Sequence, residues 1–296
     1  MEVLFLGTSS MQPTAKRNLL GMLVSHGSEK ILVDCGEGTQ RQMKIAKFAP
    51  TKLTRILITH THTDHTLGLG GLVRNLAANQ YSGTLEIYGP KGIKETYYHF
   101  VEALNKKVEL KVKIHEVQDG IVYEDKEIKI EAKKLQHSIE CFGYTIQEKD
   151  RRKINLTYLK KFGLEQNPIL GKLQKGQDIV WKGKEISASK GTKLITGKKL
   201  AIVLDTRKCK NAVELAKDAD LLICESTYDA GDHELAIKRK HLTSVHAAEI
   251  ARDGNAKSLI LTHFSQRYKS VTGLKKEAKK VFSNTECAED FMKVKV

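Results

Sequence analysis

Short apolar runs alternate along the chain with stretches whose apolar positions recur at helical spacing. Runs of four or five apolar or β-branched residues, bounded by turn residues, predict buried strands. They lie at Val3–Leu6, Met22–Ser25, Lys30–Val33, Arg55–Thr59, Leu200–Leu204, Leu221–Cys224 and Ser258–Thr262. Helical spacing occurs at Leu67–Asn79, Ala212–Lys217, Leu242–Arg252 and Leu274–Val281. We therefore predict an α/β fold in which two sheets are covered by helices on the outside.

The pattern changes between residues 148 and 199, where regular periodicity is poor. Lysines are frequent here, and glycines recur at Gly163, Gly171, Gly176, Gly183, Gly191 and Gly197. Irregular stretches of this length inside a domain are usually functional or disordered. We predict that 148–199 is an inserted basic arm rather than part of the core, a solvated surface loop being the alternative.

Length and charge narrow the class of protein. The chain has 296 residues, which is enough for a single large domain over 1–296 that carries such an insertion. Its formal net charge of +15 favours a polyanionic partner, because each neutralised phosphate releases a condensed counterion. General basicity explains the charge equally well, so the charge alone does not identify a nucleic-acid partner.

Cysteine usage and hydropathy bear on the compartment. The five cysteines are odd in number and form no C-x-x-C pair, which argues against a disulfide framework and against a cysteine zinc site. They fit buried thiols in a reducing compartment. No run approaches the roughly 18 apolar residues of a membrane helix, and the N-terminus lacks signal-peptide features. We predict a cytoplasmic protein with no membrane partner.

A cluster of metal-ligand residues follows the predicted strand Arg55–Thr59. His60, His62, Asp64 and His65 form an H-x-H-x-D-H frame. Residues two apart on extended backbone point to one side, so His60 and His62 face the same point, and Asp64 and His65 follow at the start of a helix. A histidine-rich surface loop is the alternative. Four ligand-type residues in this frame instead favour a site that serves two metal ions.

Three further ligand-type residues follow strand-like runs: His137 follows Glu127–Lys133, Asp205 follows Leu200–Leu204, and His263 follows Ser258–Thr262. Strand ends along one sheet edge can converge on one point, so these residues are candidates to complete the site. Imidazole and carboxylate ligands without thiolate suit zinc better than manganese or iron. The histidines without this placement, predicted to be surface or packing residues, are His26, His99, His115, His233 and His246.

The H-x-H-x-D-H frame resembles that of the metallo-β-lactamase superfamily. Other blocks are similar to those of the ribonuclease Z family of transfer RNA 3′-processing endonucleases. These blocks are Leu6–Ser10 with Pro13 and Arg17-Asn18, Asp34–Gln42, Asp205–Arg207, His241–Thr243 and Leu261–Tyr268. The resemblance runs nearly end to end. It implies an αββα four-layer sandwich with an inserted flexible arm, and an enzyme that removes the 3′ trailer from precursor transfer RNA.

The resemblance also implies the metal ligands, with two zinc ions per chain. It assigns one ion to His60, His62 and His137, and the other to Asp64, His65 and His263. Asp205 would bridge the two ions, and Asp34 would brace the loop of the H-x-H-x-D-H frame.

Acid, base and RNA contacts follow from the same resemblance. Asp64 is the expected general base, and His241, oriented by Glu225, is the expected acid for the ribose 3′-oxygen. A helix-start residue is the alternative role for His241. The residues expected to contact RNA are Pro13, Arg17, Asn18 and Arg267. For Asn18 the alternative is a turn cap, and for Arg267 it is packing beside His263.

Three departures from the family pattern stand out. Leu204 replaces the usual glycine before the bridging aspartate, and Ser226 replaces an alanine; both are small changes that leave the expected metal site intact. In the arm, Asn167-Pro168 stands where a Gly-Pro pair is usual, so the way in which the arm contacts RNA is open.

Rival functions differ in what they need. A small-molecule phosphodiesterase would use the same metal site without the basic arm. A thioester or lactone hydrolase would share the H-x-H-x-D-H frame but not the Pro13–Asn18 and Leu261–Tyr268 blocks. An inactive RNA-binding relative would not need a complete ligand set. We therefore predict an endoribonuclease whose partner is precursor transfer RNA and not DNA, and the resemblance implies a homodimer.

Overall fold

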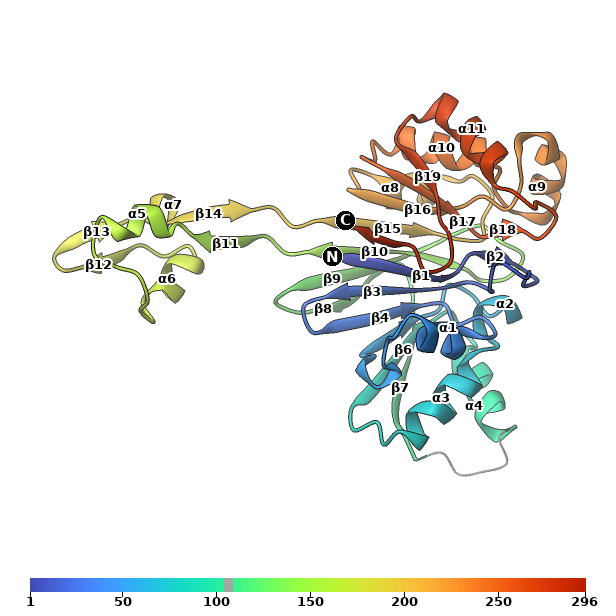
Figure 1. The fold of residues 1–296 in the computed structure, drawn as a ribbon, viewed down its shortest axis with the longest axis horizontal. Helices are drawn as coiled ribbons and strands as arrows, with labels where there is room; N and C mark the ends of the chain where they lie inside the picture. The colour runs from blue at the N-terminus through green and yellow to red at the C-terminus, as the bar shows by residue number, and fades with distance from the viewer. Residues whose placement is uncertain (104–108) are drawn as a thin grey trace.

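The computed structural model describes residues 1–103 and 109–296. In this part of the chain, two sheets of seven strands each pack face to face (Figure 1). The first has the order β20 (Lys293–Lys295), β1 (Glu2–Gly7), β3 (Gly21–His26), β4 (Glu29–Val33), β5 (Arg55–Leu57), β6 (Thr84–Gly89) and β7 (Lys111–Glu116). The second has the order β19 (Thr285–Cys287), β17 (Leu259–Thr262), β16 (Leu221–Glu225), β15 (Lys199–Val203), β10 (Phe142–Glu148), β9 (Ile128–Lys134) and β8 (Gly120–Glu124). A short parallel pair, β2 (Ser9–Ser10) with β18 (Phe264–Ser265), links the N-terminal and C-terminal halves.

Helices cover the outer side of each sheet, so the layers follow the order helix, sheet, sheet, helix (Figure 1). Beside the first sheet lie α1 (Thr39–Ile45), α2 (Thr63–Thr66), α3 (Leu69–Ala78) and α4 (Ile93–Glu102). Beside the second sheet lie α8 (Lys210–Ala216), α9 (His233–Arg239), α10 (Ser244–Asp253) and α11 (Thr272–Val281). The predicted four-layer order is therefore observed. Among the described residues, no helix has the length and apolar character that crossing a membrane requires.

Both faces of the central strands are buried, which explains why they read as continuous apolar runs. In β1, Val3 and Phe5 lie in the core between the sheets, whereas Leu4 and Leu6 pack beneath the helices of the first sheet. A slip by one residue would exchange these two sets between the faces. The observed register pairs Val3 with Val24 of β3, and burial on both sides holds it there.

The ends of several strands meet at one edge of the two sheets. In the second sheet, β15, β16 and β17 are parallel neighbours, so their carboxyl ends lie together. The segment after β5 in the first sheet is tied to this edge by two contacts with β10. The Phe142 N–H donates to the Thr59 carbonyl at 2.9 Å, and the Tyr144 hydroxyl donates to the Ile58 carbonyl at 2.7 Å. The loop after β5 therefore lies close to the residues that follow β15, β16 and β17.

The stretch predicted as an arm leaves the second sheet between its neighbouring strands β10 and β15 and projects far from the four layers (Figure 1). Strands β11 (Arg151–Ile154) and β14 (Thr192–Ile195) pair antiparallel and lead to a small lobe. The lobe contains α5 (Leu156–Lys160), α6 (Leu170–Gln174), β12 (Ile179–Trp181), β13 (Lys184–Ile186) and α7 (Ala188–Gly191). Its separate apolar cluster consists of Leu159, Leu164, Leu173, Ile179, Ile186 and Ala188. Because the apolar residues of this small cluster are widely spaced in the sequence, the arm shows little periodicity although it is ordered.

Two glycines allow the segment after β4 to pack closely against the segment after α2. A Cβ at Gly68 would lie 2.2 Å from the Gly36 carbonyl oxygen and 2.9 Å from that of Cys35. A Cβ at Gly36 would lie 2.5 Å from the Asp64 carbonyl oxygen. All three neighbours are backbone atoms, which cannot turn aside as a side chain can. This close approach therefore fixes the segment that carries Asp64 and His65.

We expect Gly68→Ala to destabilise the protein by about 1–3 kcal/mol, as overpacking of a well-packed site does. Thermal unfolding of the purified protein measures this effect. Gly273→Ala in α11 is the control, because nothing lies within 4 Å of an added Cβ there. The control should leave the midpoint unchanged or raise it slightly, since alanine favours a helix. Equal midpoints for the two variants would contradict the close contact at Gly68.

Candidate metal centre and active site

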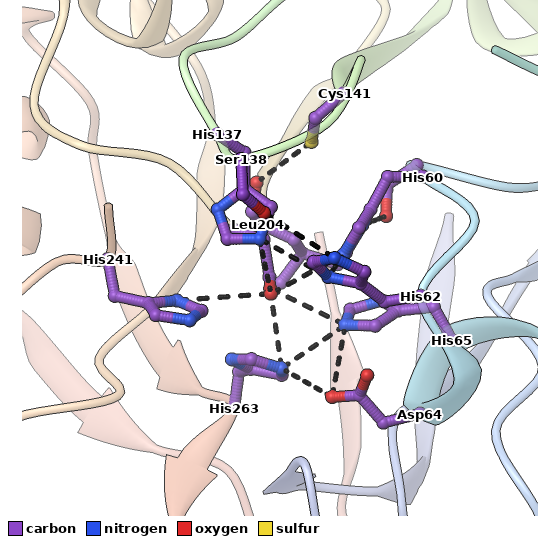
Figure 2. A network of polar contacts seen from close by, with 12 residues as sticks. His60, His62, Asp64, His65, His137, Ser138, Cys141, Leu204, His241 and His263 are labelled. Carbon is purple, nitrogen blue, oxygen red and sulfur yellow. Dashed lines mark hydrogen bonds and ion pairs between the residues drawn. The ribbon is translucent and has the colours of Figure 1, made fainter. Parts of the chain in front are cut away.

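All seven residues predicted as metal ligands gather where the strand ends meet (Figure 2). They come from the loop after β5, from α2, and from the segments that follow β9, β15 and β17. In chain order they are His60, His62, Asp64, His65, His137, Asp205 and His263. Six of them are buried, and His62 is partly buried.

A first group consists of three histidines and one carboxylate. His60 Nε2 lies 2.9 Å from His62 Nδ1, which in turn lies 3.3 Å from His137 Nε2. Asp205 Oδ2 lies 3.6 Å from His60 Nε2 and 3.9 Å from His137 Nε2. Distances of this size fit donor atoms that surround one metal ion with bonds of about 2.0–2.2 Å.

A second group adjoins the first and shares Asp205 with it. His65 Nε2 and His263 Nε2 lie 3.2 Å apart, and Asp64 Oδ2 is 3.5 Å from each of them. Asp205 Oδ1 lies 3.5 Å from His65 Nε2 and 3.3 Å from His263 Nε2. Asp205 thus presents Oδ2 to the first group and Oδ1 to the second.

Three residues of the site have left-handed backbone conformations. The φ angles are 55° at Asp34, 38° at Asp205 and 59° at His263. This region costs a non-glycine residue about 1–2 kcal/mol. Each of these residues follows the last strand residues of β4, β15 or β17, so the turn re-aims its side chain. The left-handed turn at each of these three positions thus coincides with a side chain that lies in the candidate site.

Asp34 orients two of the histidines. Its carboxylate accepts hydrogen bonds from the Thr59 backbone N–H and hydroxyl, both at 2.8 Å, and lies 2.7 Å from His65 Nδ1. His65 Nδ1 is therefore the protonated nitrogen that faces Asp34, and Nε2 faces the site. Since the Thr59 hydroxyl donates to Asp34, it accepts from His60 Nδ1 at 3.1 Å, which directs His60 Nε2 inward. Carboxylate partners of this kind fix the rings of metal-ligating histidines.

The rings of His137 and His263 are oriented in the same way. His137 Nδ1 donates to the Lys240 carbonyl oxygen at 3.0 Å. The Thr227 hydroxyl donates to Glu225 Oε2 at 2.5 Å and therefore accepts from His263 Nδ1 at 3.0 Å. Both rings consequently turn Nε2 toward the centre of the site, as His60 and His65 do.

The centre of the site is rich in acceptor atoms and attracts positive charge. Asp205 Oδ1 is buried without a hydrogen-bond partner among the described residues. Burial opposes ionisation of Asp205, but the surrounding histidines, with His263 first, hold its pKa well below the usual range. Burial also opposes a charge on His65, but Asp205 and Asp34 raise the pKa of His65 well above its usual value. A metal cation satisfies such a buried anion among inward-facing imidazole nitrogens, so these residues fit a metal site.

His241 and Glu225 lie against the same centre. His241 Nδ1 is 2.9 Å from Glu225 Oε2 and 3.8 Å from Asp205 Oδ2. Glu225 is fully buried, and its other oxygen accepts a hydrogen bond from the Thr206 N–H at 2.6 Å. Burial lowers the pKa of His241, but Glu225 and then Asp205 outweigh it and raise that pKa to about 9. His241 is thus protonated at neutral pH, and its side chain is partly accessible, so it is able to donate a proton to a bound substrate.

The segment that carries three of the predicted RNA contacts is held against the rest of the protein. Pro13 is exposed. Arg17 donates from Nη2 to the Tyr268 carbonyl at 2.9 Å, and Asn18 donates from Nδ2 to the Glu37 carbonyl at 2.8 Å. Arg17 and Asn18 therefore tie loops together, and contact of these three residues with RNA stays a prediction.

Arg267, the fourth predicted RNA contact, lies on the C-terminal side of the site. It forms an ion pair with Asp232 at 2.8 Å, and its guanidinium lies 5.3 Å from the ring centroid of Tyr228. Its side chain is 45% exposed, so it is free to meet a ligand with its remaining N–H groups. Its contact with RNA also stays a prediction.

Four residues that touch the site were not predicted from the sequence. Thr59 and Thr227 orient ligand rings, and Lys240 contacts His137. The Met11 N–H donates to Asp64 Oδ2 at 2.8 Å. The sequence offers a signal for Thr59, because Thr59 directly follows an apolar run and directly precedes His60. No comparable signal marked Lys240 or Met11, whose contacts join segments that are distant in the sequence.

A four-layer sandwich with histidine and carboxylate donors gathered at one edge of its sheets places the protein in the class of the metallo-β-lactamase fold with a candidate metal site. The structure of the short form of human tRNase Z matches with a TM-score of 0.71 and 26% identity, covering 100% of this chain and 99% of that one. The metallo-β-lactamase fold protein YhfI from Bacillus subtilis matches with a TM-score of 0.72 and 22% identity, covering 99% and 98%. At 22% identity, the similarity to YhfI shows only that the two proteins share a fold.

The chain belongs to the ribonuclease Z family. Ribonuclease Z of Archaeoglobus fulgidus is 40% identical to it, covering 100% of this chain and 97% of that protein. Ribonuclease Z of a Picosynechococcus species is 39% identical, covering 99% and 95%. A family model described as Anti-Pycsar protein Apyc1 matches residues 1–158. The ribonuclease Z relatives and the match to human tRNase Z confirm the family, the fold class and the enzyme class predicted from the sequence.

Proposed function

We propose that this protein cuts precursor transfer RNA and removes its 3′ trailer, leaving a 3′-hydroxyl on the transfer RNA and a 5′-phosphate on the trailer. The observation that carries the proposal is the pair of donor groups around Asp205, in a chain 40% identical over its whole length to a ribonuclease Z. The match to human tRNase Z supports the substrate class. The five free cysteines support a reducing compartment, and we propose the cytoplasm.

The proposed metal content is two zinc ions per chain. His60, His62 and His137 would hold one ion, and Asp64, His65 and His263 would hold the other, with Asp205 between them. Imidazole and carboxylate donors without thiolate support zinc. When bound, the two ions would supply a water of lowered pKa and positive charge for the oxygens of the phosphodiester.

The residues of the chain then have separate tasks in the proposed reaction. Asp64 accepts the proton of the water that attacks phosphorus, and the Met11 N–H, 2.8 Å from Asp64 Oδ2, holds that carboxylate in place. As the bond between phosphorus and the ribose 3′-oxygen breaks, His241 donates a proton to the leaving oxygen. Glu225 keeps His241 charged and oriented through the 2.9 Å contact at Nδ1.

We further propose that the arm over residues 148–199 binds the transfer RNA away from the cut, while residues 1–296 otherwise form a single domain. The lobe of the arm lies at the opposite end of the molecule from β17 and β18 (Figure 1), so it does not line the metal centre of its own chain. Its exposed cations support contact with phosphates. They include Arg151, Lys153, Lys160, Lys161, Lys172, Lys175, Lys182, Lys184, Lys190 and Lys193.

Cleavage of one precursor transfer RNA, with both ends at the cut identified, tests the proposed function. The expected result is a single cut at the 3′ side of the acceptor stem, a 3′-hydroxyl on one product and a 5′-phosphate on the other. Zinc-loaded protein that hydrolyses a small phosphodiester but leaves precursor transfer RNA intact would refute the proposed substrate. That outcome would instead favour a small-molecule phosphodiesterase.

Deleting the arm should separate binding from chemistry. Removal of Arg151–Ile195 takes out the paired strands β11 and β14 together with the lobe. A short Gly/Ser linker then joins two ends that are already close, because the Gly197 N–H donates to Asp150 Oδ1 at 2.8 Å. Binding of precursor transfer RNA should weaken, and the slope of log affinity against log salt should fall by about 0.7–0.9 for each phosphate that the protein no longer neutralises. Hydrolysis of a nitrophenyl phosphodiester should persist.

A charge-only variant provides the control for this deletion. Replacing Lys160, Lys161, Lys172 and Lys175 with glutamine keeps the lobe and should reproduce part of the change in the salt slope. If the deletion leaves RNA cleavage unchanged at moderate salt, the arm is a surface loop and the proposed RNA-binding role is wrong.

We also propose that the protein acts as a homodimer in which the arm of one chain serves RNA cleaved by its partner. Arm-deleted chains keep their metal site, and His62→Ala chains keep their arm, so a mixture of the two should recover part of the lost activity. Sedimentation of the intact chain as a monomer would contradict this proposal.

A further inference from the structure

Lys240 has an unusual backbone conformation for a lysine. It ends helix α9 with φ 56° and ψ 47°, in the left-handed region that favours glycine. Its N–H donates to the Ile237 carbonyl at 3.2 Å, and the N–H of His241 donates to the Ala236 carbonyl at 2.9 Å. This pair of hydrogen bonds is the usual glycine-terminated helix end. A lysine at this position keeps a side chain where glycine is usual, so the contacts of that side chain are of interest.

The side chain and the backbone of Lys240 both contact His137. The Lys240 ammonium donates to the His137 carbonyl oxygen at 3.1 Å, and His137 Nδ1 donates to the Lys240 carbonyl oxygen at 3.0 Å. The two residues are 103 positions apart in the sequence. Two hydrogen bonds in opposite directions fix both the backbone and the ring of His137 relative to the end of α9.

The contact also links two parts of the candidate active site. His241 follows Lys240 directly, and the ring centroids of His137 and His241 lie 5.0 Å apart. Figure 2 shows the rings of His137 and His241 facing the same centre. A shift of the Lys240 side chain would therefore loosen His137 relative to the chain segment that carries His241.

Lys47 is an internal comparison for this arrangement. It ends helix α1 with φ 57°, its N–H donates to the Lys44 carbonyl at 3.1 Å, and the next N–H, of Phe48, donates to the Met43 carbonyl at 2.9 Å. The helix end is thus the same as at Lys240. Within the described residues, however, the exposed Lys47 side chain makes no hydrogen bond or ion pair. The double contact with a candidate ligand is therefore a property of position 240 and not of this type of helix end.

We propose that Lys240 is a positioning residue that holds His137 in the orientation required for metal binding. The inference rests on the metal-binding role proposed above for His137 and is independent of the identity of the substrate. Loss of the ammonium leaves the Lys240 carbonyl in place but frees the His137 backbone. The affinity for one of two metal ions should therefore fall by about tenfold, the lower end of the effect expected for a partner of a ligand.

The test measures metal binding without RNA. Wild-type, Lys240→Met, Lys240→Arg, Lys240→Gly and Lys47→Met proteins are stripped of metal and titrated with Co²⁺, with the visible absorption spectrum recorded at each step. Lys240→Met and Lys240→Gly should show about tenfold weaker binding of one Co²⁺ equivalent and an altered spectrum for it. Lys240→Arg should restore binding, and Lys47→Met should match the wild type. Because glycine suits the left-handed backbone, the unfolding midpoint of metal-free Lys240→Gly should not fall.

A His137→Ala protein shows whether a negative result comes from the role given to Lys240 or from the proposed metal ligands. It should lose one Co²⁺ equivalent; if it binds two as the wild type does, the proposed ligand set is wrong. If His137→Ala loses one equivalent while Lys240→Met binds both with unchanged affinity and spectrum, Lys240 is not a positioning residue. Unchanged metal binding with a raised KM for RNA alone would also overturn the inference, because it would make Lys240 a phosphate contact.

Discussion

Asp205→Ala should lose metal from both donor groups and abolish cleavage of precursor transfer RNA. Asp205 offers Oδ2 to the first group and Oδ1 to the second, at distances of 3.3–3.9 Å from their imidazole nitrogens. Removal of a carboxylate shared by two sites takes one ligand and one negative charge from each. Zinc content per chain, measured by elemental analysis after exhaustive dialysis, should fall from near two to well below one. Activity should fall with it for RNA and for a small phosphodiester alike.

The matched control is Asp253→Ala, which removes a surface carboxylate paired with Arg252 and Lys208. It should retain metal and activity, because an exposed ion pair contributes little. Unchanged zinc content in Asp205→Ala would contradict the proposed bridging role, whatever the activity. A loss of metal in both variants would indicate general instability, which thermal unfolding of the metal-free proteins separates from loss of a ligand.

His241→Ala should keep both metal ions and slow the cleavage of precursor transfer RNA by about 10²–10⁴-fold, the range for loss of a general acid. The His241 imidazole is held protonated by Glu225 and Asp205, which raise its pKa to about 9, although burial opposes the charge. The leaving ribose oxygen is strongly basic and needs that proton. A nitrophenolate leaving group needs none, so hydrolysis of a nitrophenyl phosphodiester should fall much less.

Two further variants sharpen this test. Glu225→Gln keeps the shape of the 2.9 Å contact with His241 Nδ1 but removes the negative charge, so it should give a smaller loss with the same dependence on the leaving group. His233→Ala changes an exposed histidine outside the site and should have no effect. If His241→Ala lost activity equally on both substrates, His241 would not be the acid. Loss of zinc from the variant would instead make it a structural partner of the metal centre.

The sequence determined the layers and the positions of the central strands β1, β3, β4, β5, β15, β16 and β17, because burial on both faces leaves a continuous apolar run. The predicted ends of helices and strands differ from the observed ends by about two residues. The helix predicted at Leu242–Arg252 begins at Ser244, since the Thr243 hydroxyl accepts a hydrogen bond from the His246 N–H and caps it. The strand predicted at Arg55–Thr59 ends at Leu57, where the chain turns toward the site. Such ends are set by local hydrogen bonds that hydrophobic periodicity does not report.

Hydrophobic periodicity gives even less information about the structure of the arm. Its composition marked 148–199 as an insertion, but not the lobe packed around Leu159, Leu173 and Ile186. These residues are distant in the sequence and meet only when β11 and β14 pair and bring the two ends of the arm together. A core assembled from scattered single residues leaves no periodic trace.

The candidate ligands were evident from residue type, because an H-x-H-x-D-H frame with ligand-type residues after further strands seldom occurs except at a metal site. What only the tertiary structure decided is how their rings are oriented. Asp34 directs His65, Thr227 directs His263, and Lys240 directs His137, each across a gap of 31 to 103 residues. These contacts depend on the packing of one sheet against the other and on the ends of helices far along the chain. Sequence spacing fixes which donors are available, whereas the fold fixes which ring nitrogen faces the centre of the site.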